Sequence, residues 1–285
     1  MSISINNNML SLNVANTFNK NTVGLQNSMT ALSTGQRINY AGDDPSGMGI
    51  SERITTRIRS LDQGNVNVQN DSAIMKIADN ALANMADILG TIRQRAVQAA
   101  NDSTTTAERT NLVADMKSLV TSYDNVLKEA TYGGKSFFDS STTNTFGKDG
   151  FNVQYGPDAT NTLKFSFTDL TSGKGTAAKA MLTEIGKIKD AATAQAAITK
   201  IDDAFNAVAT EQTNIGTMEQ RLGYLAESSE AESLALTELN SSIRDTDVAK
   251  GMTEFMKYNI RTQASQFMLA QAGQVPAMVL QLLQP

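Results

Sequence analysis

Apolar residues return at every seventh position along two long stretches of the chain. The first stretch runs from Pro45 to about position 100, and the second begins at about Ala191. Such a repeat places these side chains on one side of an α-helix, where they form the seam of a coiled coil. We therefore predict a mainly α fold, an elongated bundle of long antiparallel helices. The seam residues are Ile54, Leu61, Val68, Met75, Leu82 and Leu89 in the first stretch, and Ile201, Val208, Ile215, Leu222 and Leu236 in the second.

Between the two stretches the pattern changes twice. Thr105 and Glu108 are spaced as a capping box, which predicts the start of a shorter helix antiparallel to the first stretch. Gly133 and Gly134 end that helical pattern. Residues 151–155 and 163–167 then alternate apolar and polar side chains around a Gly-Pro-Asp turn. This alternation predicts a β-hairpin within a β region at about 135–170, laid on the helices because it is too small to be stable alone.

The two ends of the chain carry almost no charge. Before Arg37 the only charged side chain is Lys20, and none follows Arg261, although 19% of all residues are charged. Each end combines an apolar stripe at helical spacing with a face of amides and hydroxyls. The stripes are Leu10, Val14, Phe18, Leu25, Met29 and Leu32 at the start, and Ile260, Phe267, Val275, Met278 and Leu282 at the end. Two interpretations stay open: the stripes assemble with other copies of the chain, or they pack within an ordinary helical bundle.

Residues 37–50 interrupt the helical pattern between a first helix, expected over 4–33, and the long first stretch. Asp44 is placed to cap a helix that starts at Pro45. Asp43 and Asp44 could instead hold a cation, but adjacent carboxylates lack the spacing of a ligand series, so we favour capping. We expect an inner domain of residues 1–43 and 244–285, a bundle domain of residues 44–243, and no large outer domain. Pro276 should bend or fray the last helix.

The amino-acid composition excludes several kinds of catalytic and metal-binding site. The 285 residues include no histidine, cysteine or tryptophan. This excludes disulfides, histidine-dependent nucleophiles and zinc sites built from His or Cys. We predict no enzymatic activity, no cofactor and no metal site. The net charge of -5 argues against a nucleic-acid partner, and the glutamines of the C-terminal stretch argue against a membrane span.

Both ends resemble the signatures of the bacterial flagellins. RINYAGDDPSG, which starts at Arg37, is similar to the most specific part of that family's N-terminal signature, and LAQAGQVP, which starts at Leu269, to that of its C-terminal signature. FNVQYGPDATNTLKFSF, from Phe151, matches the position of the family's β region. The resemblance implies a structural subunit that polymerises with copies of itself into the extracellular flagellar filament used for motility. It also implies that the inner domain surrounds a central channel.

The resemblance implies partners as well. Flagellins leave the cell unfolded through the flagellar type III apparatus, which fits a first segment that lacks the pattern of a cleaved leader. A flagellar export chaperone, the filament cap and hook-associated proteins are the other expected partners. Some flagellins activate toll-like receptor 5 through an Arg, a Leu and a Glu. Those places here hold Thr91, Arg95 and Asp115, so we expect weak recognition.

Two alternative functions stay open. A hook-filament junction protein, one of the hook-associated proteins, shares the terminal helices. A chemoreceptor-like cytoplasmic coiled coil would share the seven-residue repeats. The match from Ala270 to Pro276 and the short middle of the chain favour the filament over the junction. The uncharged ends and the hairpin disfavour the chemoreceptor.

Overall fold

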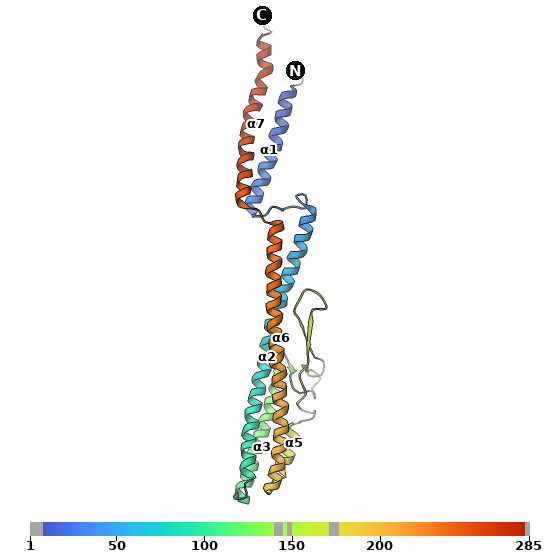
Figure 1. The fold of residues 1–285 in the computed structure, drawn as a ribbon, viewed down its shortest axis with the longest axis vertical. Coiled ribbons are helices and arrows are strands. Elements are labelled where there is room, and N and C mark those ends of the chain that lie inside the picture. Colours follow the sequence, from blue (N-terminus) through green and yellow to red (C-terminus); the bar gives the residue numbers. More distant parts are fainter. Residues whose placement is uncertain (1–7, 140–144, 147–149, 171–176, 283–285) are drawn as a thin grey trace. The chain divides into compact units, whose positions relative to one another are not determined.

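The computed structural model describes residues 8–139, 145–146, 150–170 and 177–282, and Figure 1 shows how its elements follow one another. The helices are α1 (Met9–Thr34), α2 (Pro45–Ala99), α3 (Thr106–Glu129), α5 (Ala177–Gly186), α6 (Ala191–Arg244) and α7 (Val248–Leu282). The strands are β1 (Thr131–Tyr132), β2 (Lys135–Ser136), β3 (Phe151–Gln154) and β4 (Thr162–Phe165). The predicted mainly α fold with a small antiparallel hairpin is confirmed.

The chain folds as two compact units. The first unit comprises residues 1–58 and 234–285, and the second comprises residues 59–233. The helices α2 and α6 contribute residues to both units. α2 starts at Pro45 and α6 ends at Arg244, next to the boundaries expected from the sequence. The expected division into residues 1–43 with 244–285 and residues 44–243 stays a prediction.

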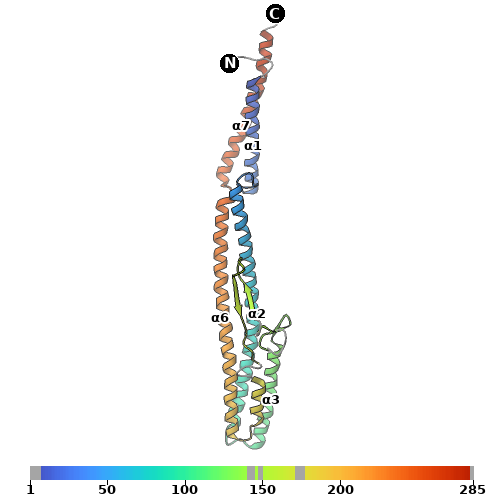
Figure 2. The same cartoon turned by 90° about the vertical axis from the view of Figure 1, so that its right-hand side faces the viewer.

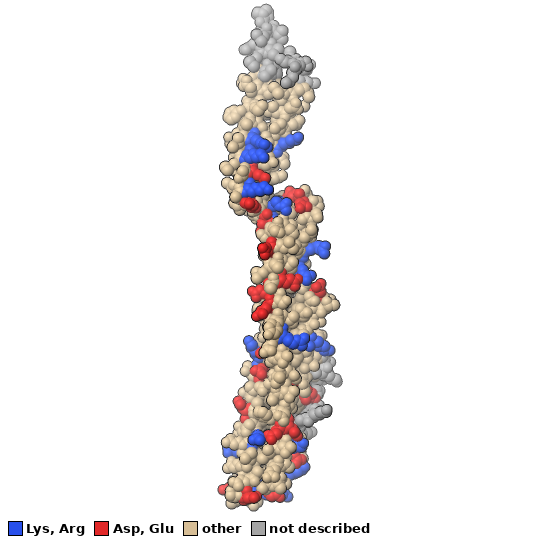
Figure 3. All heavy atoms as spheres, in the orientation of Figure 1, with Lys and Arg blue, Asp and Glu red and all other residues tan. Residues whose placement is uncertain are grey.

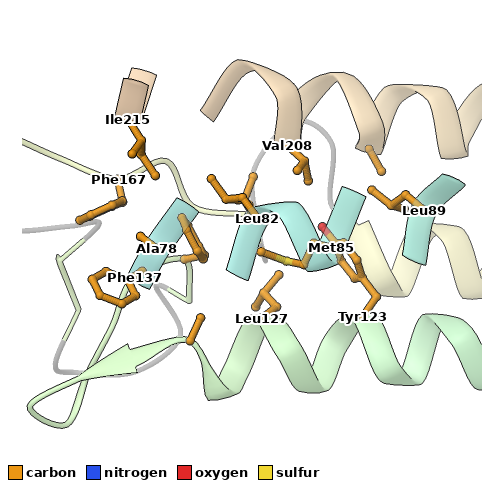
Figure 4. Close-up of a cluster of buried hydrophobic side chains, with 14 of the residues drawn as sticks. Ala78, Leu82, Met85, Leu89, Tyr123, Leu127, Phe137, Phe167, Val208 and Ile215 are labelled. Atoms are coloured by element: carbon orange, nitrogen blue, oxygen red, sulfur yellow. The ribbon is translucent and has the colours of Figure 1, made fainter. Parts of the chain in front are cut away.

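The second unit is organised around one continuous apolar core. Figure 4 shows α2 between α6 and α3, with the Leu82 and Met85 side chains of α2 directed into the space that the three helices share. Leu127 of α3 and Val208 of α6 reach into the same space, and all four of these side chains are buried. The seven-residue repeat explains this arrangement, because it keeps one side of each long helix apolar over many turns.

Two short hairpins and a short helix complete the second unit. In the predicted hairpin, β3 pairs with β4 in antiparallel register, from Phe151 opposite Phe165 to Gln154 opposite Thr162. The pair β1–β2 turns through Gly133 and Gly134, whose φ angles of 57° and 78° favour glycine. The elements β1, β2 and α5 were not predicted from the sequence. Figure 2, which turns the view by 90°, shows β3 and β4 alongside the long helices.

The predicted helix starts are confirmed. Asp44 Oδ1 accepts a hydrogen bond from the Gly47 N–H at 2.9 Å, which caps α2. The Thr105 and Glu108 side chains form the complete capping box of α3. The hydrogen bonds that Glu108 accepts from Thr105 lower the pKa of the Glu108 carboxyl.

One expectation about the terminal helices needs correction. α1 begins at Met9, and residues 4–7 of the expected first helix lie outside the described part of the chain. A fray at Pro276 is wrong, because α7 continues through this position to Leu282, whereas a bend there stays a prediction. A proline removes one hydrogen bond of the helical ladder, and the neighbouring bonds are sufficient here to continue the helix.

Candidate assembly surface

In the first unit, α1 and α7 pack against each other as an antiparallel pair that is joined by polar contacts. Asn21 Nδ2 donates to Ser265 Oγ at 3.0 Å, and both side chains are buried. Near the other end of the pair, Asn8 Nδ2 donates to the Ala272 carbonyl oxygen at 2.9 Å. Hydrogen bonds between buried polar groups are directional, so they set the register of two helices more strictly than apolar contacts do.

Small residues let the two helix backbones come close. A Cβ atom at Gly24 would lie 2.5 Å from Cε1 of Tyr258, so only glycine leaves room for this ring against α1. A Cβ atom at Gly251 would lie 3.0 Å from Leu32 Cδ2. The residues of α7 that face α1 therefore recur every seven positions but are mostly not large and apolar. They are Gly251, Tyr258, Ser265 and Ala272.

The opposite side of α7 is apolar and uncovered. An α-helix turns about 100° per residue, so the residues of this side point away from those that face α1. Ile260 is 67% exposed and Phe267 is 78% exposed. We call this side the outer α7 face, and it consists of Val248, Met252, Met256, Ile260 and Phe267. Exposed Gln263 lies on the same side between Ile260 and Phe267. A folded chain rarely leaves so many large apolar side chains of one helix face in water without a partner.

The two predicted terminal stripes therefore have different surroundings. Within the stripe of α1, Val14, Phe18, Leu25 and Leu32 are half-buried, whereas Leu10 and Met29 are exposed. Within the stripe of α7, Ile260 and Phe267 belong to the outer α7 face. The side chains of Val275, Met278 and Leu282 lie outside the described residues.

Charge on the α1/α7 pair is confined to part of its length. On the side drawn in Figure 3, the blue and red atoms of this pair gather near its base, and the rest is uncharged. Lys250, Lys257 and Arg261 are the basic residues of α7. A helical surface without charges beyond Arg261 can be buried against another protein surface without the large cost of desolvating ions.

The segment that joins α1 to α2 is held against the end of α6. The Arg37 N–H donates to the Arg244 carbonyl oxygen at 2.6 Å, and the Thr246 N–H donates to the Gly35 carbonyl oxygen at 2.9 Å. Asp43 Oδ2 accepts the N–H groups of Asn39 and Tyr40, each at 3.0 Å. Asp43 and Asp44 thus each accept backbone hydrogen bonds, which supports the capping interpretation. Within the described part of the chain, no cluster of three or more carboxylates is arranged to hold a metal ion.

The predicted bundle seam lies inside a single chain. Every seam residue named from the sequence is buried except Leu236, which is half-buried. These side chains stabilise the chain itself and are not available to a partner. Among the described helices, none is long and apolar enough to cross a membrane.

Comparison with known proteins identifies the family. A model of the bacterial flagellin N-terminal helical region matches residues 5–143, and a model of the C-terminal helical region matches residues 198–283. A flagellin of Halalkalibacterium halodurans is 34% identical over 98% of this chain and 99% of its own length. A flagellin of Bacillus subtilis is 32% identical with the same coverage. The chain belongs to the bacterial flagellin family. It is a structural subunit of the flagellar filament.

A solved structure supports the same architecture. A putative flagellar hook-associated protein from Vibrio parahaemolyticus superposes with a TM-score of 0.61 at 18% identity, and the match covers 71% of this chain and all of that protein. This likeness shows the fold alone. The filament assignment rests on the flagellins, which match almost the whole chain.

Thr91, Arg95 and Asp115, which the sequence resemblance places at the expected receptor-region positions, lie on α2 and α3. Arg95 Nε and Asp115 Oδ2 form an ion pair at 3.0 Å, with both side chains nearly half exposed. Thr91 is exposed on α2, and its hydroxyl donates to the Asp87 carbonyl oxygen at 3.0 Å. Two of the three positions are therefore paired with each other.

Two buried charged residues of this flagellin make structural hydrogen bonds that were not predicted from the sequence. Arg109 of α3 donates to the carbonyl oxygens of Ala99 at 2.9 Å, Asn101 at 3.1 Å and Lys189 at 3.2 Å. It thus ties the end of α2 to the segment before α6. Arginine is suited to this role, because its planar head carries five donors. No seven-residue pattern could have revealed it.

The second is Glu211 of α6, which accepts the Thr168 N–H at 3.0 Å. This bond holds the chain beyond β4 against α6. A signal was present in this case, because Glu211 interrupts an apolar row of α6, and a carboxylate at a core position needs a donor.

Proposed function

We propose that the outer α7 face, together with the exposed apolar residues of α1, is the surface on which copies of this flagellin polymerise. The observation that carries the proposal is that large apolar residues of α7 lie exposed on the side away from α1. Full burial of one large apolar side chain contributes about 1.5–3 kcal/mol. A stripe of several such side chains, repeated at every subunit contact, supplies a substantial driving force for a helical homopolymer.

The polar contacts between α1 and α7 support the same proposal. Buried hydrogen bonds contribute only about 1 kcal/mol each in net terms. The α7 side of the seam is mostly small or polar, so the two helices gain less stability from their own pairing than a seam of large apolar residues would give. Surfaces that the isolated chain leaves uncovered, such as the outer α7 face, can supply further stability. We infer that the pair gains order when it is covered by neighbouring subunits.

Seeded polymerisation of the full chain tests this proposal. Phe267→Ala removes the most exposed ring of the outer α7 face, and we expect the critical concentration to rise at least about tenfold, equivalent to about 1.4 kcal/mol. Met268→Ala is the matched control, since Met268 is also exposed but projects to another side of α7. Sedimentation and electron microscopy would measure the polymer. Equal effects of the two substitutions would contradict the assignment of the face.

We infer further that the filament subunit reaches its place outside the cell by flagellar export. In this proposal an export chaperone covers the C-terminal segment before assembly, and the filament cap and hook-associated proteins meet the subunit afterwards. The exposed apolar residues of α7 support a chaperone, because they would otherwise promote aggregation. A truncation that ends after Arg261 should lose chaperone binding in a pull-down with the export chaperone of the same bacterium.

We propose that the chain has no enzymatic activity, in keeping with its structural role. It has no histidine or cysteine to act as a nucleophile or general base near neutral pH. The carboxylates of Asp202 and Asp203 are partly exposed and form surface ion pairs. Asp202 accepts from Arg93 at 2.6 Å, and Asp203 pairs with Lys200 at 3.0 Å.

Weak recognition by toll-like receptor 5 is the remaining proposal. Arg95 is engaged by Asp115, and Thr91 offers a small side chain in place of a bidentate cation. In a cell reporter assay, we expect this flagellin to need a far higher concentration than a flagellin with Arg, Leu and Glu at these positions. The triple variant Thr91→Arg, Arg95→Leu, Asp115→Glu should gain potency. Full potency of the unmodified chain would reject the proposal.

A further inference from the structure

Methionines are distributed unequally between two parts of this molecule. Among the described side chains, the exposed methionines all belong to α1 or α7, and they are Met9, Met29, Met252, Met256 and Met268. Those of the second unit are buried, and they are Met75, Met85, Met116, Met181 and Met218. An exposed thioether reacts with oxidants in solution, whereas a buried one is shielded by its neighbours.

Two of the exposed methionines lie on the outer α7 face. Met252 is 44% exposed and Met256 is 54% exposed, and they are four residues apart, so their side chains are neighbours on the helix surface. Ile260 continues the same face one turn further on. A change in the polarity of this methionine pair therefore alters the middle of the apolar stripe and not its margin.

We propose that Met252 and Met256 form an oxidation site that decides whether a free subunit can join the polymer. This inference rests on the proposed role of the outer α7 face in polymerisation. The oxidant is hydrogen peroxide or another peroxide. The thioether sulfur attacks one peroxide oxygen, the O–O bond breaks, and an S–O bond forms. The sulfur is oxidised by two electrons to the sulfoxide, and after proton transfer the second oxygen leaves as water from hydrogen peroxide or as an alcohol from an organic hydroperoxide.

The consequence for assembly follows from polarity. A sulfoxide is a strong hydrogen-bond acceptor, and its burial against an apolar surface without a donor is unfavourable. Oxidation thus converts two apolar contacts of the face into two unsatisfied polar groups. In the polymer the same sulfur atoms are covered by a neighbouring subunit, so they react slowly. Sensitivity to peroxide is therefore a property of the free subunit, and assembly removes it.

The experiment exposes free subunits and finished polymers to the same dilute hydrogen peroxide. Peptide mass spectrometry then measures sulfoxide at each methionine, and seeded elongation measures assembly. We expect Met252 and Met256 to oxidise at least about tenfold faster in the free subunit than in the polymer, and oxidised subunits to elongate at least about tenfold more slowly. Treatment with methionine sulfoxide reductases should restore elongation, since the modification is reversible.

Variants separate this pair from other methionines. The double variant Met252→Leu, Met256→Leu keeps the volume and the apolar character of the face, so it should elongate normally before peroxide and lose far less of its elongation rate after peroxide than the unmodified chain. Met268→Leu, which removes an exposed methionine outside the face, should remain as sensitive as the unmodified chain. Normal elongation of subunits that carry sulfoxide at both positions would overturn the proposal. Normal elongation of untreated Phe267→Ala subunits would instead overturn the assignment of the polymerising face.

Discussion

The second unit and the α1/α7 pair are both helical, but they are stabilised in opposite ways. In the second unit the large apolar side chains point inward, and Leu82, Met85 and Leu89 are fully buried. In the α1/α7 pair the buried seam contains Asn21 and Ser265, and the large apolar side chains of the outer α7 face point away from α1. The first arrangement stabilises the chain from within, and the second leaves an apolar surface exposed, which in our proposal neighbouring subunits cover.

This difference separates two uses of the same seven-residue spacing. In α2 and α6 the repeat carries large apolar residues and builds a core. In α7 the residues that face α1 also recur every seven positions, but they are small or polar, and the apolar residues occupy the other side of the helix. The periodicity alone shows that a helix has a seam. The size of the residues in that seam decides whether it stabilises one chain or only sets the register of a pair that assembles further.

The largest expected effect is the loss of core packing in the second unit. Leu82→Ala should lower the free energy of unfolding of the full chain by about 2–5 kcal/mol, since it leaves a cavity among α2, α3 and α6. Urea unfolding followed by circular dichroism measures it. Ile260→Ala is the matched control on the outer α7 face, and it should change subunit stability by less than about 0.5 kcal/mol. Similar losses for both variants would remove the distinction between the two regions.

A second prediction concerns the close contact between the β3–β4 hairpin and α2. A Cβ atom at Gly64 would overlap the carbonyl oxygen of Tyr155, and a backbone atom cannot move away by a rotamer change. Gly64→Ala should therefore destabilise the second unit by about 1–3 kcal/mol, despite the better helix propensity of alanine. Gly90→Ala, where no atom lies within 4 Å of the added carbon, should instead stabilise α2 by up to about 1 kcal/mol. Thermal unfolding of both variants measures the contrast.

The sequence was sufficient to predict most of this architecture. The repeats located α2 and α6, the capping box located the start of α3, and strict alternation located β3 and β4. These signals are local, because each depends on residues a few positions apart. The short helix α5 was missed, since only Met181 and Ile185 are buried among its described residues, which is too few to show a helical period.

The environment of each apolar stripe could not be predicted in the same way. The stripes of α1 and α7 have the same period, yet α1 turns much of its stripe toward α7, whereas α7 turns Ile260 and Phe267 away. This choice depends on how closely Gly24 and Tyr258 let the backbones approach, which is a property of two helices together. The contacts of Arg109 were missed for a similar reason, because its acceptors lie outside α3, two of them at the end of α2 and one at Lys189, which is distant in the chain.

A third and smaller effect is expected within the α1/α7 pair. Gly24→Ala places its Cβ against the Tyr258 ring, and a ring can rotate, so we expect a net loss of only about 1 kcal/mol in the pairing of the helices. Hydrogen exchange of the α1 amides should become about fivefold faster. In a Tyr258→Ala background the sign should reverse, since the clash is absent and the propensity gain remains. If the α1 amides of Gly24→Ala exchange more slowly than those of the unmodified chain while Tyr258 is present, the seam accommodates an added methyl group.

The smallest effect concerns a carboxylate within the second unit. Burial raises the pKa of Asp71 to about 6 in the folded chain, from a usual value of 3.8. Between these two values the folded chain binds more protons than the unfolded chain, so stability falls as pH rises from about 4 to 6. The cost is complete above pH 6. Asp71→Asn removes it, and after allowance for solvent screening of a partly exposed group we expect a gain of about 1 kcal/mol or less at pH 7.5.

At pH 4 the gain from Asp71→Asn should be much smaller, because the carboxyl is then protonated in the folded chain and close to half protonated in the unfolded chain. Urea midpoints at the two pH values measure the difference, and Asp87→Asn, at an exposed position of the same helix, is the control. A gain that is equal at both pH values would indicate a packing effect of the amide and not a titration. A gain confined to pH 7.5 would show that the second unit tolerates one partly buried charge, because its apolar core offsets the cost. The α1/α7 pair lacks such a core, and the polar groups of its buried seam are neutral ones such as Asn21 and Ser265.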